Sequence, residues 1–120
     1  MKLLIKSATI VDQQSDYHLK QADIFIKDGI IIKIGSSIKE KADKEINIQG
    51  LHVSQGWFDT SVSFGEPGYE ERETIENGLK TAAFSGFTDV VLNAHSNPTI
   101  DNSSAIHSIK AKAQGNAVNL

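Results

Sequence analysis

The 120-residue sequence predicts an α/β protein in two portions that differ in hydrophobic pattern. In residues 1–54, short extended runs alternate with turn residues, which predicts a small antiparallel sheet. In residues 55–120, extended and helical periods alternate, which predicts βαβ units with parallel strands. The strongest local signal is Asp28-Gly29, which lies between two β-branched runs. This pair predicts a hairpin, because a type I′ turn needs positive φ at both central residues.

The first portion is expected to contain only strands and turns. Its apolar residues occur in runs too short for helices, and the polar stretch at residues 39–44 predicts a loop. Gln49-Gly50 predicts a turn before the last of these strands. The extended runs are residues 3–5, 8–10, 23–27, 30–35, 46–48 and 51–53.

The second portion begins with an expected strand at residues 57–64, followed by a helix at residues 74–85. The helix is predicted from apolar residues that recur at i, i+4, i+7 and i+8 and form one face. Gly86 occupies the position of a glycine that ends a helix. The apolar positions of this face are Ile75, Leu79, Ala82 and Ala83.

A second unit of the same kind follows. Residues 87–93 are rich in valine and leucine, as expected for a buried parallel strand. Residues 102–114 predict a helix with Ile106 and Ile109 on its apolar face, and residues 117–120 predict the start of a third strand. Because such a strand would expose an apolar edge, we expect the chain to be the N-terminal part of a longer protein or to need a partner. The alternative is a compact domain that covers its own edge.

Composition narrows the classes of function. The chain has no cysteine, which excludes disulfides and thiolate metal sites and fits a reducing cytoplasm. The formal net charge is −3 and no basic patch stands out, so nucleic acid is not an expected partner. No apolar run approaches the roughly 18 residues that a membrane-spanning helix requires, so no membrane partner is expected.

Four spaced motifs carry a resemblance to a known family. They are Phe-x-Glu-Pro-Gly at residues 64–68, an acid-x-Ile-x-x-Gly helix start at 73–78, Ala-Ala-x-x-Gly-Phe-Thr at 82–88 and Asn-Pro-x-x-Asp at 97–101. In these positions the chain resembles the dihydroorotases of pyrimidine biosynthesis, which belong to the metal-dependent amidohydrolase superfamily. The resemblance implies an N-terminal β-sandwich portion at residues 1–54. It also implies the first βα units of a (β/α)8 TIM barrel at residues 55–120, truncated.

The departures from this family fall on functional positions. The family strand reads Asp-x-His-x-His, and its two histidines hold a catalytic zinc. This chain keeps Asp59 but has Ser61 and Ser63 at the histidine positions. Two neutral hydroxyls are poor zinc ligands, so we expect a degenerate metal site with no catalytic residue and no bound cofactor. The resemblance places the remaining zinc ligands beyond residue 120.

Two substrate-binding positions of the family also differ. Gly65 stands at the position of an arginine that grips the substrate carboxylate, and it offers no donor side chain. His95 stands at the position of a substrate-binding asparagine. It is interpreted either as an anion-binding side chain or as an ordinary histidine of a surface loop.

Three hypotheses about function remain open at this stage. The first is a non-catalytic dihydroorotase-like protein that acts as a scaffold for aspartate transcarbamoylase or associates with itself, a role implied only by inactive members of the family. The second is an active dihydroorotase or related cyclic amidohydrolase whose ligands lie elsewhere in a longer chain. The third is a small interaction module without enzymatic activity. Ser61, Ser63 and Gly65 favour the first over the second.

Overall fold

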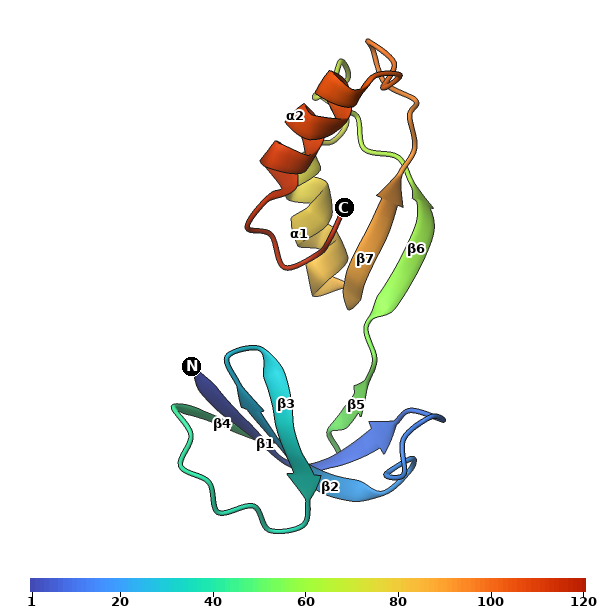
Figure 1. Ribbon diagram of the computed structural model, residues 1–120. Helices are drawn as coiled ribbons and strands as arrows, with labels where there is room; N and C mark the ends of the chain where they lie inside the picture. Colours follow the sequence, from blue (N-terminus) through green and yellow to red (C-terminus); the bar gives the residue numbers. More distant parts are fainter. The chain divides into compact units, whose positions relative to one another are not determined.

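The computed structural model describes all of residues 1–120 and divides into two compact units, Met1–Gln55 and Gly56–Leu120 (Figure 1). The first unit contains one five-stranded sheet, and the second contains a two-stranded parallel sheet and two helices. The predicted α/β class, with a strand-rich first part followed by βα units, is confirmed. Neither helix is long and apolar enough to cross a membrane.

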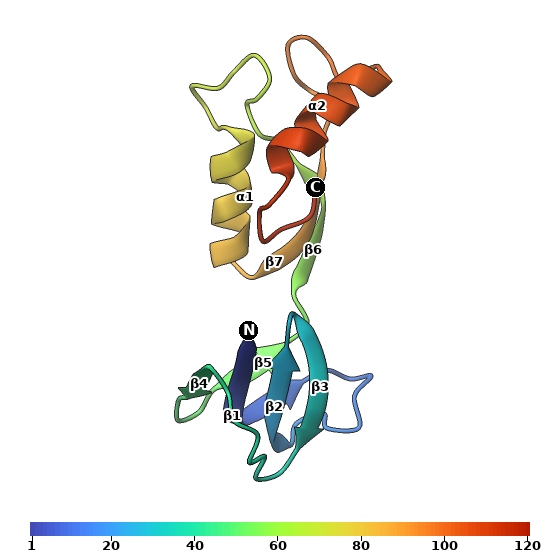
Figure 2. The ribbon, with the colours of Figure 1, turned by 60° about the vertical axis from the view of Figure 1, so that its left-hand side comes forward.

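The sheet of the first unit is built around its first and longest strand. Strand β1 pairs with β2 on one edge and with both β4 and β5 on the other, while β3 pairs with β2 (Figure 2). The strands are β1 (Lys2–Val11), β2 (Gln21–Lys27), β3 (Ile30–Gly35), β4 (Lys44–Asn47) and β5 (His52–Ser54).

The prediction that this sheet is purely antiparallel is wrong. Strands β1, β2 and β3 are antiparallel neighbours, but β4 and β5 both run parallel to β1. The reason is the length of β1, which has ten residues and accepts two short strands in series along one edge. Its residues 3–6 pair with β4 and its residues 9–11 pair with β5, on either side of an irregularity at Ser7, whose φ is 51°.

The hairpin between β2 and β3 agrees with the sequence pattern. Asp28 and Gly29 have φ angles of 51° and 81°, so both central residues are in the left-handed region that a type I′ turn requires. An aspartate tolerates this region better than most residues, and glycine adopts it without steric cost. The predicted turn is confirmed at both positions.

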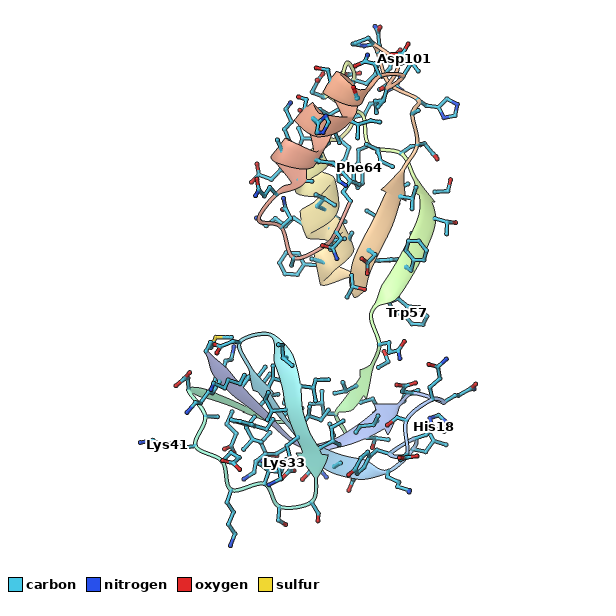
Figure 3. The ribbon with its side chains drawn as sticks, viewed as in Figure 1. His18, Lys33, Lys41, Trp57, Phe64 and Asp101 are labelled. Carbon is cyan, nitrogen blue, oxygen red and sulfur yellow. The ribbon has the colours of Figure 1, made fainter.

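The second unit has the predicted βαβ order. Its elements are β6 (Trp57–Val62), α1 (Ile75–Phe84), β7 (Phe87–Leu92) and α2 (Ser103–Ala113). Strands β6 and β7 pair in parallel, and both helices pack on the same side of them (Figure 1). Strand β6 ends at Val62, before the predicted limit, and the chain then turns Phe64 into the core beneath the helices (Figure 3).

Helix α1 is confirmed together with its apolar face. Thr74 caps its start, because the Thr74 hydroxyl accepts a hydrogen bond of 3.2 Å from the backbone N–H of Asn77. Ile75 and Leu79 have no exposed surface and form the centre of the core of the second unit. Gly86 directly follows the cap residue with a φ of 90°, as expected for a glycine that ends a helix.

Helix α2 agrees with the prediction in position but only partly in its buried face. Ile109 is buried against the core, whereas Ile106, on the same predicted apolar face, is 49% exposed. At the end of the chain, the backbone N–H of Val90 donates to Asn119 at 2.9 Å. The backbone N–H of Asn119 in turn donates to Thr88 at 2.9 Å. This single parallel bridge stands in place of the third strand expected at residues 117–120.

Candidate functional site

The ends of β6 and β7 bring together the residues that depart from the family motif. In parallel α/β folds, ligands bind at the carboxyl ends of the strands. Ser61 lies near the end of β6 and Ser63 just beyond it, while Asn93 directly follows β7. The backbone N–H of Asn93 donates to the carbonyl of Val62 at 2.9 Å, which fixes Asn93 beside the two serines.

One asparagine amide joins both serine side chains. The Nδ2 atom of Asn93 donates to Ser61 Oγ at 3.1 Å and to Ser63 Oγ at 3.2 Å. The Ser61 hydroxyl is also 3.4 Å from Asn93 Oδ1. We call Ser61, Ser63 and Asn93 the Ser–Asn cluster. The structure therefore brings the two predicted positions together, but through hydrogen bonds to a third residue.

Zinc does not fit the donor set of this cluster. Its side chains are two hydroxyls and one amide, all neutral, whereas zinc sites use thiolate, imidazole or carboxylate ligands. The Asp59 carboxylate, two residues before Ser61, accepts a hydrogen bond of 2.9 Å from the backbone N–H of Ser61. No three histidine, cysteine, aspartate or glutamate side chains gather anywhere in the chain to hold a metal ion.

Gly65 lies at a point where the backbone leaves no room for a side chain. A Cβ atom at this position would lie 1.9 Å from the carbonyl oxygen of Tyr69 and 3.0 Å from that of Glu73. Two hydrogen bonds of 2.9 Å close this loop: the N–H of Gly65 donates to Glu73, and the N–H of Tyr69 donates to Gly65. An arginine at residue 65 would require a different loop.

Glu66 ties this same loop to both helices. Its Oε2 atom accepts a hydrogen bond of 2.9 Å from the backbone N–H of Ile75, at the start of α1. Its Oε1 atom is paired with Lys112 of α2. The hydrogen bond from Lys112 and then that from Ile75 hold the pKa of Glu66 below its usual value, and the same pair raises the pKa of Lys112. Glu66 is therefore an ionised structural group.

His95 lies apart from these contacts. It is an exposed residue of the loop that follows β7, and no hydrogen bond or ion pair joins it to the Ser–Asn cluster. Nothing in this arrangement gives it a role at the ends of the strands.

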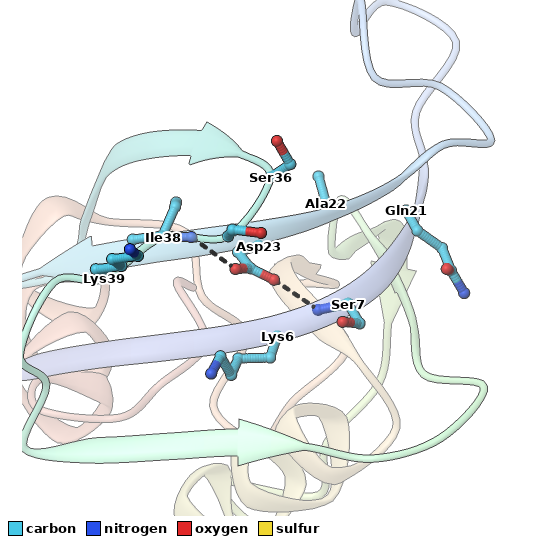
Figure 4. Close-up of a pocket in the computed structure, with 9 residues that line it drawn as sticks. Lys6, Ser7, Gln21, Ala22, Asp23, Ser36, Ile38 and Lys39 are labelled. Atoms are coloured by element: carbon cyan, nitrogen blue, oxygen red, sulfur yellow. Dashed lines mark hydrogen bonds between the residues drawn. The ribbon is translucent and has the colours of Figure 1, made fainter.

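A second concave region lies in the first unit. It is a cavity of about 530 Å³ whose lining includes Lys6, Lys39 and the buried Asp23 (Figure 4). Both oxygens of the Asp23 carboxylate are already used, because they accept hydrogen bonds of 2.9 Å from the backbone N–H groups of Ser7 and Ile38. Asp23 thus stabilises two irregular backbone segments, which accounts for its burial.

Two residues of the second unit were missed by sequence reasoning. Asn93 lies within the turn motif, and its position directly after a parallel strand was the signal that could have identified it. Lys112 carries no comparable signal, because its partner Glu66 is 46 residues away in the sequence.

Comparison with known proteins agrees with this architecture. The structure of the L-hydantoinase (dihydropyrimidinase) from Arthrobacter aurescens matches 92% of this chain and 24% of its own, with a TM-score of 0.79. At 24% sequence identity this match shows a shared fold. The chain therefore has the fold of the corresponding part of this hydantoinase.

Relatives with curated sequences define the family more narrowly, although no family model matches the chain. The dihydroorotase of Ruminiclostridium cellulolyticum is 38% identical over 96% of this chain and 27% of its own length. The dihydroorotase of Pelotomaculum thermopropionicum is 38% identical over 100% of this chain and 28% of its own length. The chain belongs to the dihydroorotase family and spans a little over a quarter of the length of these relatives.

Proposed function

We propose that this chain is the N-terminal part of a dihydroorotase-like protein that holds no catalytic zinc and acts without catalysis. The observation that carries the proposal is the Ser–Asn cluster at the ends of β6 and β7, where the family motif has its two histidines. Metal-dependent hydrolysis needs a metal-bound water whose pKa is lowered to near neutral. Neutral hydroxyl and amide groups do not supply the ligands for that metal.

The loop at Gly65 supports the same proposal, because it lacks a residue that would bind the substrate. A substrate carboxylate is best held by a bidentate arginine, and residue 65 has neither a donor nor room for one. Loss of the metal ligands affects the chemical step, and loss of the carboxylate grip affects substrate binding. Their joint absence favours a non-catalytic role over a slow enzyme.

For that role we propose the scaffolding of aspartate transcarbamoylase, by analogy with inactive members of the family. Large exposed apolar side chains of the second unit fit burial against further protein, either the rest of the gene product or a partner. Trp57 is 63% exposed, Phe58 61% and Phe84 85%.

The test is a binding experiment with a parallel activity assay. The full gene product that carries this chain would be co-expressed with the aspartate transcarbamoylase of the same organism and analysed by size-exclusion chromatography with light scattering. We expect a stable complex, weakened by Phe84→Ser, together with no turnover of dihydroorotate or carbamoyl aspartate. Zinc-dependent turnover would instead favour an active cyclic amidohydrolase, and a monomer without a partner would exclude the scaffold.

A further inference from the structure

We infer that Asn93 is a metal-excluding residue, whose side-chain amide occupies the point between Ser61 and Ser63 where a divalent cation would bind. This inference rests on the proposed function, because it explains how a zinc-free state is maintained. Asn93 does not stand at a metal-ligand position of the family, so comparing those positions alone does not identify it. It also changes what is needed to rebuild a metal site in this chain.

The geometry places a single nitrogen atom between the two hydroxyls. Ser61 and Ser63 present their oxygens to the same side, because one amide nitrogen contacts both. Nδ2 of Asn93 lies 3.1 Å from one oxygen and 3.2 Å from the other. An amide nitrogen has two N–H donors, one for each serine.

The electrostatics of this arrangement oppose a cation. A metal ion needs lone pairs from its ligands, but here lone pairs of both hydroxyl oxygens already accept N–H hydrogens. The hydrogens carry the positive end of the amide dipole and lie where the ion would sit. A cation would have to displace both hydrogen bonds and would gain only neutral oxygens in return.

Asn93 is also held in place by its own backbone. Its N–H donates to the carbonyl of Val62 at 2.9 Å and extends the pairing of β6 with β7. Ser61 is fixed from the other side, because its N–H donates to Asp59 Oδ1 at 2.9 Å. Asn93 is half-buried, whereas both serines are exposed, so Asn93 is the least solvated member of the cluster.

Replacing the serines by histidines should therefore not suffice to recover metal binding. In Ser61→His/Ser63→His, the Asn93 amide can donate to the imidazole nitrogens and compete with the ion. Adding Asn93→Leu keeps a side chain of similar shape but removes the donor. We expect Zn²⁺ to bind the triple variant with a dissociation constant about tenfold lower than that of the double variant, measured by isothermal titration calorimetry.

Two controls make the comparison specific. Ile30→His/Ile32→His places the same His-x-His spacing on β3. Both positions are exposed, at 65% and 57%, and no asparagine amide donates a hydrogen bond to them. This pair should bind Zn²⁺ about as well as the triple variant. Ser61→Ala/Ser63→Ala/Asn93→Leu reports the background from the four native histidines. Circular dichroism checks that every variant is folded.

A second substitution protects the test against a folding defect of Asn93→Leu. Asn93→Ala also removes the amide donor and adds no metal ligand, so it should likewise tighten Zn²⁺ binding in the double-histidine background. Equal affinities of the double variant and both triple variants would overturn the inference. That failure differs from failure of the proposed function, which would appear as stoichiometric zinc in the wild-type gene product.

Discussion

Glu66 accepts a hydrogen bond of 2.9 Å from the backbone N–H of Ile75, so a carboxylate from the loop after β6 caps the first turn of α1. Lys112 of α2 pairs with the same carboxylate. The side chain of Glu66 is only 11% exposed, while that of Lys112 is 55% exposed. Because the lysine is well solvated, the bond to Ile75 is expected to contribute more to stability than the ion pair.

Substitution of Glu66 by alanine is therefore expected to destabilise the second unit. It removes the acceptor of an N-terminal helix N–H and a negative charge near the positive end of the helix dipole. We expect a loss of about 1 kcal/mol in the free energy of unfolding, measured by urea denaturation. Glu71→Ala is the matched control, because Glu71 lies in the same loop and is 70% exposed. Equal effects of the two substitutions would contradict the role of Glu66.

The same group predicts a dependence of stability on pH. The pKa of Glu66 is lower in the folded state than in the unfolded chain, where it is about 4.3. Its contribution is therefore fully present above that value and is lost as the pH falls through the lower, folded-state pKa. The difference in urea midpoint between wild type and Glu66→Ala should shrink below about pH 4. A difference that stays constant on acidification would show that ionisation of Glu66 is not responsible.

Leu79 tests the core of the second unit. It has no exposed surface and lies in the cluster formed with Ile75, Val90 and Ile109. Leu79→Asp places an unpaired carboxylate there, which costs several kcal/mol, so the thermal unfolding of the second unit should be lost or strongly lowered. Lys80→Asp introduces the same residue at the adjacent exposed position and should change the melting temperature little. Comparable melting temperatures for both variants would mean that the buried face of α1 is assigned incorrectly.

Gly65 provides a test of the loop that replaces the arginine position. A Cβ atom there would lie 1.9 Å from the carbonyl oxygen of Tyr69, so Gly65→Ala should destabilise the protein by about 1–3 kcal/mol. Gly35→Ala is the control, because a Cβ at that position meets nothing within 4 Å and its φ is not in the left-handed region. Similar unfolding midpoints for the two variants would show that the loop adapts easily and that Gly65 does not prevent an arginine.

Most of the elements that could be predicted from the sequence are determined by residues close to one another in the chain. The hairpin at Asp28-Gly29 and the helix from Ile75 are encoded by residues close in sequence, through turn geometry and helical periodicity. The parallel pairing of β4 and β5 with β1 is not local. It depends on the length of β1 and on the irregularity at Ser7, and neither has a distinct pattern in the sequence.

In the candidate site, too, some residues could be predicted from the sequence and others could not. Ser61 and Ser63 could be identified from the sequence because they occupy spaced positions of a family motif on one strand. Asn93 could not be assigned to them, because its contact is made across β6 and β7 and joins residues 32 and 30 positions apart. The exposure of Ile106 has a related cause: helical periodicity gives the apolar face of a helix but not how far the neighbouring elements cover that face.

The most direct test of the central claim is the zinc content of the full gene product, purified after growth in zinc-supplemented medium and measured by elemental analysis. The Ser–Asn cluster predicts a zinc content near zero per chain, because neither its hydroxyls nor its amide replace the two histidines. Stoichiometric zinc that survives dialysis would contradict the claim, because it would mean that other residues hold the metal and that the protein is equipped for hydrolysis.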